Sequence, residues 1–243
     1  MRLDKFLAQL GLGSRKEVKK YIADGLVKVN GETIRQVKYA VDEFQDRVTY
    51  LDSPLHYQEF YYILLNKPAG IVSAKHDNLY ETVIDWVRLD YDHVDLFPVG
   101  RLDRDTTGLL LLTNHGQLAH RLLSPKHHVD KVYQALVTGQ VNIEDIQAFQ
   151  DGIILADFTC QPADLVVESY DSRRDQSLVQ VTIHEGKFHQ VKRMFQARDH
   201  QVLSLHRLAM GPLVLDSDLD LGDYRELSPE ECQALEEYGL ENR

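Results

Sequence analysis

The spacing of apolar residues changes along the chain and divides it into two parts. Between Leu3 and Leu10, apolar residues recur every three or four positions, which predicts an amphipathic helix. Ser14 and Glu17 form a capping-box pair, which predicts the start of a second helix. The segment Val27–Glu32 is typical of a strand that enters a tight hairpin. We expect these elements to form a small N-terminal domain over residues 1–55.

After a polar linker at residues 52–59, short apolar segments typical of strands outnumber the helical patterns. The candidate strands are Phe60–Leu65, Leu109–Thr113, Val132–Val137, Gly152–Leu155, Leu165–Val167, Leu178–Ile183 and Leu213–Leu215. The candidate helices are Thr82–Val87, Gly116–Leu123, Ile143–Phe149 and Gln190–Ala197. Because strands and helices do not alternate regularly, we expect an α+β fold with a mixed, antiparallel-dominated sheet. This second domain is assigned to residues 56–243.

The composition excludes several classes of protein. Of the 243 residues, 43% are hydrophobic, which is enough for a packed core. Cys160 and Cys232 are too few for a disulfide framework or a cysteine-based zinc site. No segment resembles a signal peptide, and no apolar run approaches the roughly 18 residues of a membrane span. We therefore expect a cytoplasmic protein with no membrane partner.

The charge is distributed unevenly. The net charge is −11 at pH 7, which by itself argues against a nucleic-acid partner. Residues 1–28 nevertheless carry seven basic side chains against three acidic ones. The basic ones are Arg2, Lys5, Arg15, Lys16, Lys19, Lys20 and Lys28. A solvated helix face is the ordinary explanation of such a cluster, and a surface that binds a polyanion is the alternative.

The segment Gly100–Asn114 is the most informative part of the sequence. A short polar loop with Asp103 and Asp105, beside Arg101 and Arg104, leads into four consecutive leucines. Such an apolar run is typical of a buried strand, so the loop joins a rigid element. Nearby cations favour the ionised form of a carboxylate. A simple charged turn would also explain the pattern, as would two carboxylates that act as an acid and base pair.

The string G-R-L-D-R-D-T-T-G-L-L-L-L-T-N resembles the signature of the pseudouridine synthases, in particular the RsuA-type family that acts on ribosomal RNA. The resemblance implies that Asp103 is the catalytic residue and that Asp105 shapes the loop. Residues 1–45 are similar to the RNA-binding domain named after ribosomal protein S4. That similarity implies phosphate contacts, which position RNA but read little of its sequence. The residues expected to make them are Arg2, Lys5, Arg15, Lys16, Lys19 and Lys20.

Two further motifs extend the resemblance. The pair Lys131 and Tyr133 matches a K-x-Y motif whose tyrosine stacks on the target base, although a tyrosine packed in a strand is the ordinary alternative. The line E-G-K-F-H-Q-V-K-R-M resembles a family motif in which a basic residue pairs with the catalytic carboxylate. That position is Lys192, where many relatives have arginine. Because lysine cannot form the bidentate fork, Arg193 stays an alternative partner.

The resemblance implies the isomerisation of one uridine to pseudouridine in ribosomal RNA. We expect uridine-516 of 16S ribosomal RNA as the target; a 23S ribosomal RNA synthase and a non-catalytic ribosome-assembly protein are the alternatives. Further RNA contacts are expected from Arg101, Arg104, Lys131, Lys187, His189 and Arg193. An isomerisation needs no cofactor, and no nucleotide-binding glycine loop is present. His127 and His128 lack the spacing of metal ligands, so we expect no metal, and we expect a monomer.

Overall fold

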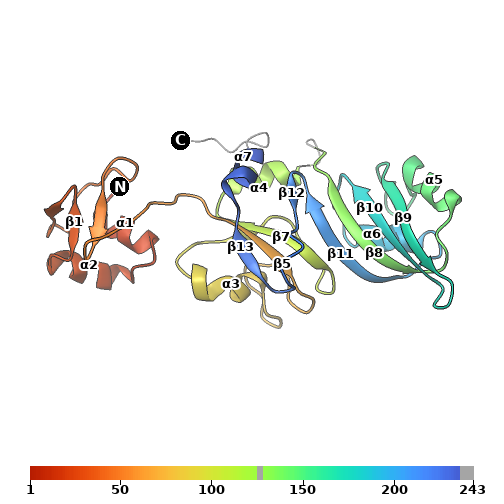
Figure 1. The fold of residues 1–243 in the computed structure, drawn as a ribbon, viewed down its shortest axis with the longest axis horizontal. Helices are drawn as coiled ribbons and strands as arrows, with labels where there is room; N and C mark the ends of the chain where they lie inside the picture. The colour runs from red at the N-terminus through yellow and green to blue at the C-terminus, as the bar shows by residue number, and fades with distance from the viewer. Residues whose placement is uncertain (125–127, 236–243) are drawn as a thin grey trace. The chain divides into compact units, whose positions relative to one another are not determined.

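The computed structural model describes residues 1–124 and 128–235, and the chain forms two compact units. One unit contains Met1–Tyr61 and Val87–Leu96; the other contains Tyr62–Trp86 and the described residues from Phe97 onward (Figure 1). Within the described ranges, no helix has both the length and the apolar character that a membrane crossing requires.

The first unit combines a helix pair with a small antiparallel sheet. Its elements are α1 (Leu3–Gln9), α2 (Arg15–Ala23), β1 (Val27–Val29), β2 (Glu32–Thr33), β3 (Val48–Tyr50) and β4 (Ser53–Pro54). The strand order is β2-β1-β3-β4. The predicted capping box is confirmed, because the Glu17 carboxylate accepts from the backbone N–H of Ser14 at 2.8 Å and the Ser14 hydroxyl accepts from the backbone N–H of Glu17. The predicted linker is partly wrong, since Ser53–Pro54 pairs with β3.

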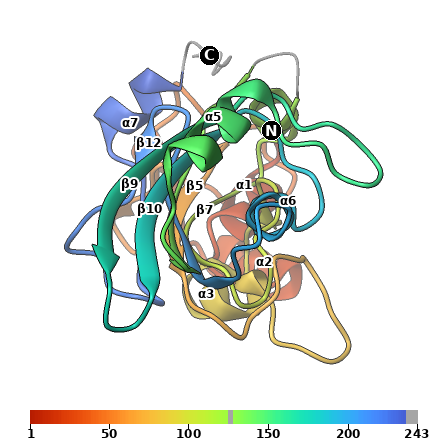
Figure 2. The same cartoon turned by 90° about the vertical axis from the view of Figure 1, so that its right-hand side faces the viewer.

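The second unit is built on one long twisted sheet (Figures 1 and 2). Its strands are β5 (Tyr62–Lys67), β6 (Phe97–Pro98), β7 (Thr107–Thr113), β8 (Lys131–Thr138), β9 (Asp164–Asp171), β10 (Gln176–Ile183), β11 (Val202–Met210), β12 (Leu213–Val214) and β13 (Tyr224–Glu226). The central order is β13-β5-β7-β11-β8-β10-β9. Among the described strands, β7 and β11 form a parallel pair and the other pairs are antiparallel, which confirms the predicted mixed sheet.

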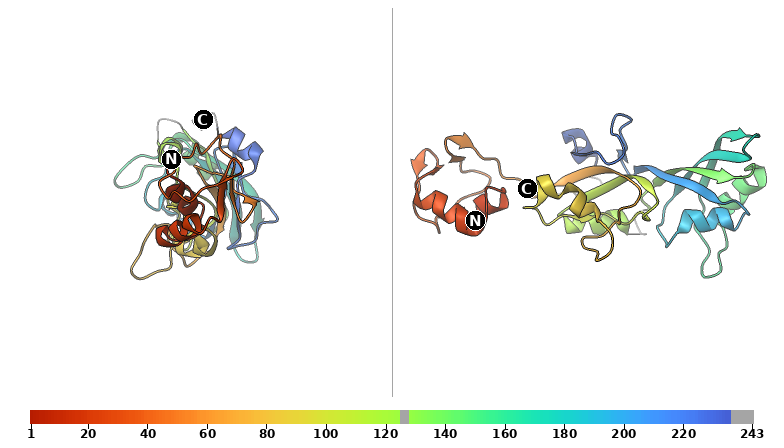
Figure 3. Two further views of the ribbon diagram at one scale, coloured as in Figure 1. Left: turned by 90° about the vertical axis from the view of Figure 1, so that its left-hand side faces the viewer. Right: turned by 90° about the horizontal axis from the view of Figure 1, so that it is seen from below.

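Helices cover parts of this sheet. They are α4 (Gly116–Leu123), α5 (Ile143–Asp151), α6 (Gln190–Gln196) and α7 (Pro229–Ala234). A further helix, α3 (Val83–Tyr91), spans the sequence boundary between the two units. Helix α4 adds Leu118 and Leu122 to a core that contains Leu109 and Leu111 of β7. Helix α6 packs against β11 (Figure 3). The ring centroids of Phe195 in α6 and Phe149 in α5 are 4.9 Å apart. The four leucines after the charged loop are therefore core residues, as predicted.

One predicted strand is wrong, and several observed strands were not predicted. Gly152–Leu155 forms only an isolated bridge between Ile154 and Thr159. Gly152 ends α5 with a φ of 91°, and a Cβ there would lie 2.6 Å from the Cys160 carbonyl oxygen, so the backbone turns away from an extended path. Conversely, β11 has nine residues but is not among the candidate strands, and neither are β3, β4, β6 and β13.

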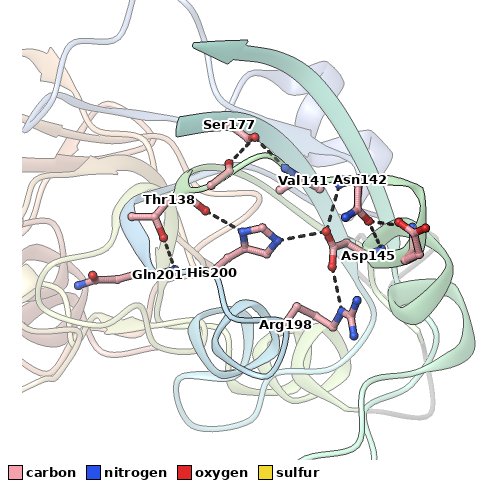
Figure 4. A network of polar contacts seen from close by, with 10 residues as sticks. Thr138, Val141, Asn142, Asp145, Ser177, Arg198, His200 and Gln201 are labelled. Atoms are coloured by element: carbon pink, nitrogen blue, oxygen red, sulfur yellow. Dashed lines mark hydrogen bonds and ion pairs between the residues drawn. The ribbon is translucent and has the colours of Figure 1, made fainter. Parts of the chain in front are cut away.

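A buried polar network ties β8, α5 and the end of α6 together (Figure 4). The Asp145 carboxylate accepts hydrogen bonds from the backbone N–H of Asn142 at 3.0 Å and from Arg198 Nε at 2.9 Å, and it lies 3.1 Å from His200 Nε2. His200 Nδ1 lies 2.7 Å from the Thr138 carbonyl oxygen. Burial alone would raise the pKa of Asp145, but these hydrogen bonds hold it below its usual range.

The network predicts a large effect of Asp145→Ala on stability. The change leaves Arg198 and His200 without their buried acceptor, so we expect the free energy of unfolding to fall by about 3 kcal/mol. Urea denaturation measures this. Gln147→Ala, at an exposed position of the same helix, is the control and should change stability by less than about 0.5 kcal/mol. An equal loss of unfolding free energy in the two variants would contradict the stabilising role given to Asp145.

Candidate active site

A buried lysine holds the backbone of the charged loop. Lys67, at the end of β5, is fully buried, and its Nζ lies 3.2, 3.3 and 2.9 Å from the carbonyl oxygens of Asp103, Arg104 and Thr106. It also donates to the carbonyl of Pro68 at 3.0 Å. Burial lowers the pKa of Lys67 to about 8, although the nearby carboxylates oppose this shift. The ammonium thus fixes the path of the loop on one side.

A serine holds the same loop just before Asp103. The Ser73 hydroxyl donates to the carbonyl of Leu102 at 3.0 Å and accepts from its backbone N–H at 3.1 Å. Both residues are buried. Because Leu102 precedes Asp103 directly, its backbone is fixed immediately before the carboxylate, and Lys67 fixes it immediately after. A side chain on such a constrained loop has little freedom to move.

The carboxylate of Asp103 faces two basic side chains. Lys192 Nζ lies 3.0 Å from its Oδ2, and His189 Nε2 lies 3.4 Å from its Oδ1. Lys192 also donates to Oδ1 of Asp105 at 2.7 Å. The side chain of Asp103 is 27% exposed and that of Asp105 is 75% exposed. The two carboxylates therefore share one ammonium, but Asp103 is much less solvated.

Lys192 lies in α6, and its charge is stabilised by these ion pairs. Partial burial alone would lower the pKa of Lys192, but the bonds to Asp105 and Asp103 raise it above its ordinary value. The hydrogen bond from Lys192 in turn lowers the pKa of Asp105. The next residue, Arg193, instead pairs with Asp157 and lies 5.2 Å from the ring of Phe158. In this structure Lys192 is the α6 residue paired with Asp103.

Tyr133 lines the same pocket from the middle of the sheet. It lies in β8, opposite Arg207 of β11 on one side and Val181 of β10 on the other. Its side chain is largely buried, and Asp103 and Lys192 line the same pocket. Three elements distant in sequence thus bring a carboxylate, an ammonium and an aromatic ring to one place.

The structure corrects the expected role of Lys131. This side chain is buried rather than exposed, and its ammonium donates to the carbonyl of Val129 at 2.9 Å. Burial and the charge of Arg207 lower the pKa of Lys131 to about 8. A phosphate contact would require Lys131 to leave this site, so we no longer expect one. Arg207 is also buried, and its Nε donates to the carbonyl of Leu109 at 2.7 Å.

The pocket lies next to a close approach of two strands. The parallel pairing of β7 and β11 aligns Gly108 with Arg207 and Thr107 with His206. Gly108 has a φ of +103°, and a Cβ built there would lie 2.3 Å from the backbone oxygen of Arg207 and 2.5 Å from its nitrogen. Only glycine fits this contact.

Gly108→Ala should therefore destabilise the protein. The methyl group collides with backbone atoms, which cannot move aside like the end of a side chain, and we expect a loss of about 3 kcal/mol or more. Thermal unfolding followed by circular dichroism measures it. The matched control is Gly116→Ala in the first turn of α4, where a Cβ meets nothing within 4 Å. Equal melting temperatures of the two variants would refute the steric argument.

The comparison with protein families agrees with this geometry. The model described as RNA pseudouridylate synthase matches residues 61–197, more than half of the chain, and the S4 domain model matches residues 1–48. The chain belongs to the RNA pseudouridylate synthase family. The resemblance predicted from the sequence motifs is confirmed.

Relatives of this synthase match it along almost its whole length. Ribosomal small subunit pseudouridine synthase A of Haemophilus influenzae is 39% identical and is matched over 97% of this chain and 99% of its own. Ribosomal large subunit pseudouridine synthase B of Bacillus subtilis is 38% identical, over 96% and 95%. A crystal structure of a pseudouridylate synthase is 38% identical, covers 97% of this chain and 99% of its own, and gives a TM-score of 0.66.

The residues expected to contact RNA lie in several places in this synthase. Those of the S4 domain are exposed: Arg2, Lys5, Arg15, Lys16, Lys19 and Lys20. Arg101, Lys187 and His189 line the pocket. Arg104 lies over the ring of Tyr80, 4.3 Å from its centroid. His127 is outside the described residues, and within them no group of three or more histidine, cysteine, aspartate or glutamate side chains could hold a metal ion.

Sequence reasoning missed two residues that shape the site. Lys67 is not among the predicted site residues, although its place directly after the apolar run Tyr62–Leu65 could have indicated a buried ammonium. Ser73 gave no signal, because its partner Leu102 is distant in sequence.

Proposed function

We propose that this chain converts a uridine of ribosomal RNA to pseudouridine. Asp103 is the catalytic carboxylate, Lys192 is its charged partner, and Tyr133 holds the everted base. The observation that carries the proposal is that these three side chains line one pocket, although they come from a loop, a helix and a strand.

The reaction breaks the N1–C1′ bond, turns the uracil over and joins C5 to C1′, after which C5 loses its proton and N1 is protonated. The nucleotide must first leave its base stack, because C1′ is inaccessible in a helix. The ionised carboxylate of Asp103 attacks C1′ or removes the 2′ hydrogen. Both routes require an anion that is poorly solvated and paired with a cation, so that it is charged and reactive. The half-buried Asp103 beside Lys192 meets this requirement better than the exposed Asp105.

The relatives' names support ribosomal RNA as the substrate. We propose the small-subunit RNA, with uridine-516 of 16S ribosomal RNA as the first candidate, and 23S ribosomal RNA as the second, because relatives of both kinds match the chain. We further propose that residues 1–55 anchor RNA, that residues 56–243 carry out catalysis, and that the protein is a cytoplasmic monomer.

The Asp103 assignment predicts a clear difference between two isosteric changes. Asp103→Asn should lower kcat by about 10,000-fold or more, because the amide can neither attack C1′ nor remove a proton. Asp105→Asn should keep most of the activity. Tritium release from ribosomal RNA labelled at C5 of uridine measures turnover, and a filter-binding assay checks that both variants still bind RNA. Turnover by Asp103→Asn would refute the role, and pseudouridine mapping identifies the target.

The ion pair predicts a second matched comparison, between neighbouring cations of α6. Lys192→Met should lower kcat about 100-fold or more, because it removes the charge beside Asp103. Lys192→Arg should recover much of this loss. Arg193→Met, which removes a cation paired with Asp157, should leave kcat within a few fold of the wild type. If Arg193→Met lost as much kcat as Lys192→Met, the proposed partner would be wrong.

A further inference from the structure

An exposed aromatic ring stacks on the histidine that faces the proposed catalytic carboxylate, and it has no part in the mechanism above. Phe188 is 71% exposed. Its ring stacks on that of His189, with centroids 3.9 Å apart and planes inclined by 16°. His189 Nε2 in turn lies 3.4 Å from Oδ1 of Asp103. A stacked pair of rings thus leads from the carboxylate out to solvent.

The segment that presents Phe188 is held in place by buried polar contacts. Gln190 is buried, and its side-chain amide donates to the buried Glu185 carboxylate at 2.7 Å and accepts from the backbone N–H of Lys187 at 2.9 Å. Glu185 also accepts from the backbone N–H of Gln161 at 2.9 Å. Ordinary exposed apolar side chains need no such support. Here the backbone on both sides of the exposed ring is fixed.

The backbone conformation of His189 is also unusual. It has φ 49° and ψ 32°, a left-handed conformation that residues other than glycine rarely adopt. The His189 side chain does not cap α6. This conformation lets the imidazole contact Asp103 while it stacks on Phe188. Such conformations persist where the surrounding structure enforces them, and they cluster at functional sites.

The pocket that His189 lines carries charges that suit a nucleotide. Lys187 and Arg101 line the pocket and supply positive charge suited to a phosphate. When a uridine leaves its base stack, the bases next to it lose a stacking partner. An exposed, fixed aromatic face can replace that partner, and it accepts any base because every base has a π face.

We propose that Phe188 stacks on the base of a nucleotide adjacent to the everted uridine and so positions the substrate RNA. The inference rests on the proposed function and assigns a residue that contacts the RNA next to the target uridine. The stacked rings of Phe188 and His189 then hold the neighbouring base while the uridine enters the pocket and packs against Tyr133.

The test compares variants of the full chain on a stem-loop RNA that spans the mapped target. Phe188→Ala should raise KM roughly 5- to 150-fold at nearly constant kcat, because one base stack is lost. Phe188→Tyr should restore the KM, and Phe188→Leu should not. The matched control is Val166→Ala in β9, which shortens an exposed apolar side chain that does not line the pocket.

A second RNA, with an abasic nucleotide in place of each neighbour in turn, identifies the contact. At one neighbouring position, removal of the base should weaken binding to the wild type as much as Phe188→Ala does, and the two changes together should cost no more than either alone. Independent effects at both neighbours would overturn the proposal. So would a fall in kcat with unchanged KM, since the ring would then act only by steadying His189.

The outcomes separate this inference from the proposed function. If the wild-type protein released no tritium from ribosomal RNA, the proposed function would be wrong. If the wild type were active and Phe188→Ala had the same KM, only the stacking inference would fail. Thermal unfolding of each variant establishes that it is folded, and because Phe188 is exposed we expect its melting temperature to stay close to that of the wild type.

Discussion

The contact of the Lys67 ammonium with four backbone carbonyls is the constraint on which the site depends. A buried charge is costly unless hydrogen bonds satisfy it, and carbonyl oxygens that point inward are costly without a donor. Each compensates for the other here, so the loop from Asp103 to Thr106 has a defined path although it contains no regular structure. Lys67 thus holds the backbone of the loop from within, and the loop's charged side chains are not part of that contact. Asp103 is therefore free to face the pocket and to be paired there with Lys192.

The same site depends on how the two parts of the sheet meet. Lys67 and the Asp103 loop belong to the β5–β7 side, whereas Tyr133 and Lys192 come from β8 and from the helix that precedes β11. The short parallel pairing of β7 with β11 joins these sides, and Gly108 permits it because no Cβ fits against the backbone of Arg207. A hydrogen bond from Arg207 to the Leu109 carbonyl adds a second link between the strands. The glycine before the leucine run thus allows the close strand pairing that joins the Asp103 side of the site to the Tyr133 side.

Features that depend on residues close together in the sequence could be predicted, and features that depend on distant residues could not. The capping box of Ser14 and the leucines of β7 were predicted correctly, since a cap needs four consecutive residues and a buried strand shows itself in its own composition. The failures depended on partners far along the chain. Gly152 turns the backbone against Cys160, Arg207 places a charge in the middle of a strand, and Lys67 meets carbonyls more than thirty residues away. For the site, the motif resemblance indicated Asp103, Tyr133 and Lys192, but their common pocket depends on the sheet order, which no local pattern contains.

The difference between Asp103 and Asp105 shows why one carboxylate suits the chemistry better. Both bind the same ammonium, and Asp105 has the shorter contact, at 2.7 Å against 3.0 Å. If the strength of the ion pair decided the role, Asp105 would be the better candidate. The exposed fractions reverse this order, because water around an exposed carboxylate stabilises its charge and must be removed before the anion can react. Asp103 is already largely desolvated, and Lys192 compensates for the water it has lost. In that arrangement Asp105 is a second acceptor for the Lys192 ammonium, so both carboxylates help to keep Lys192 charged beside Asp103.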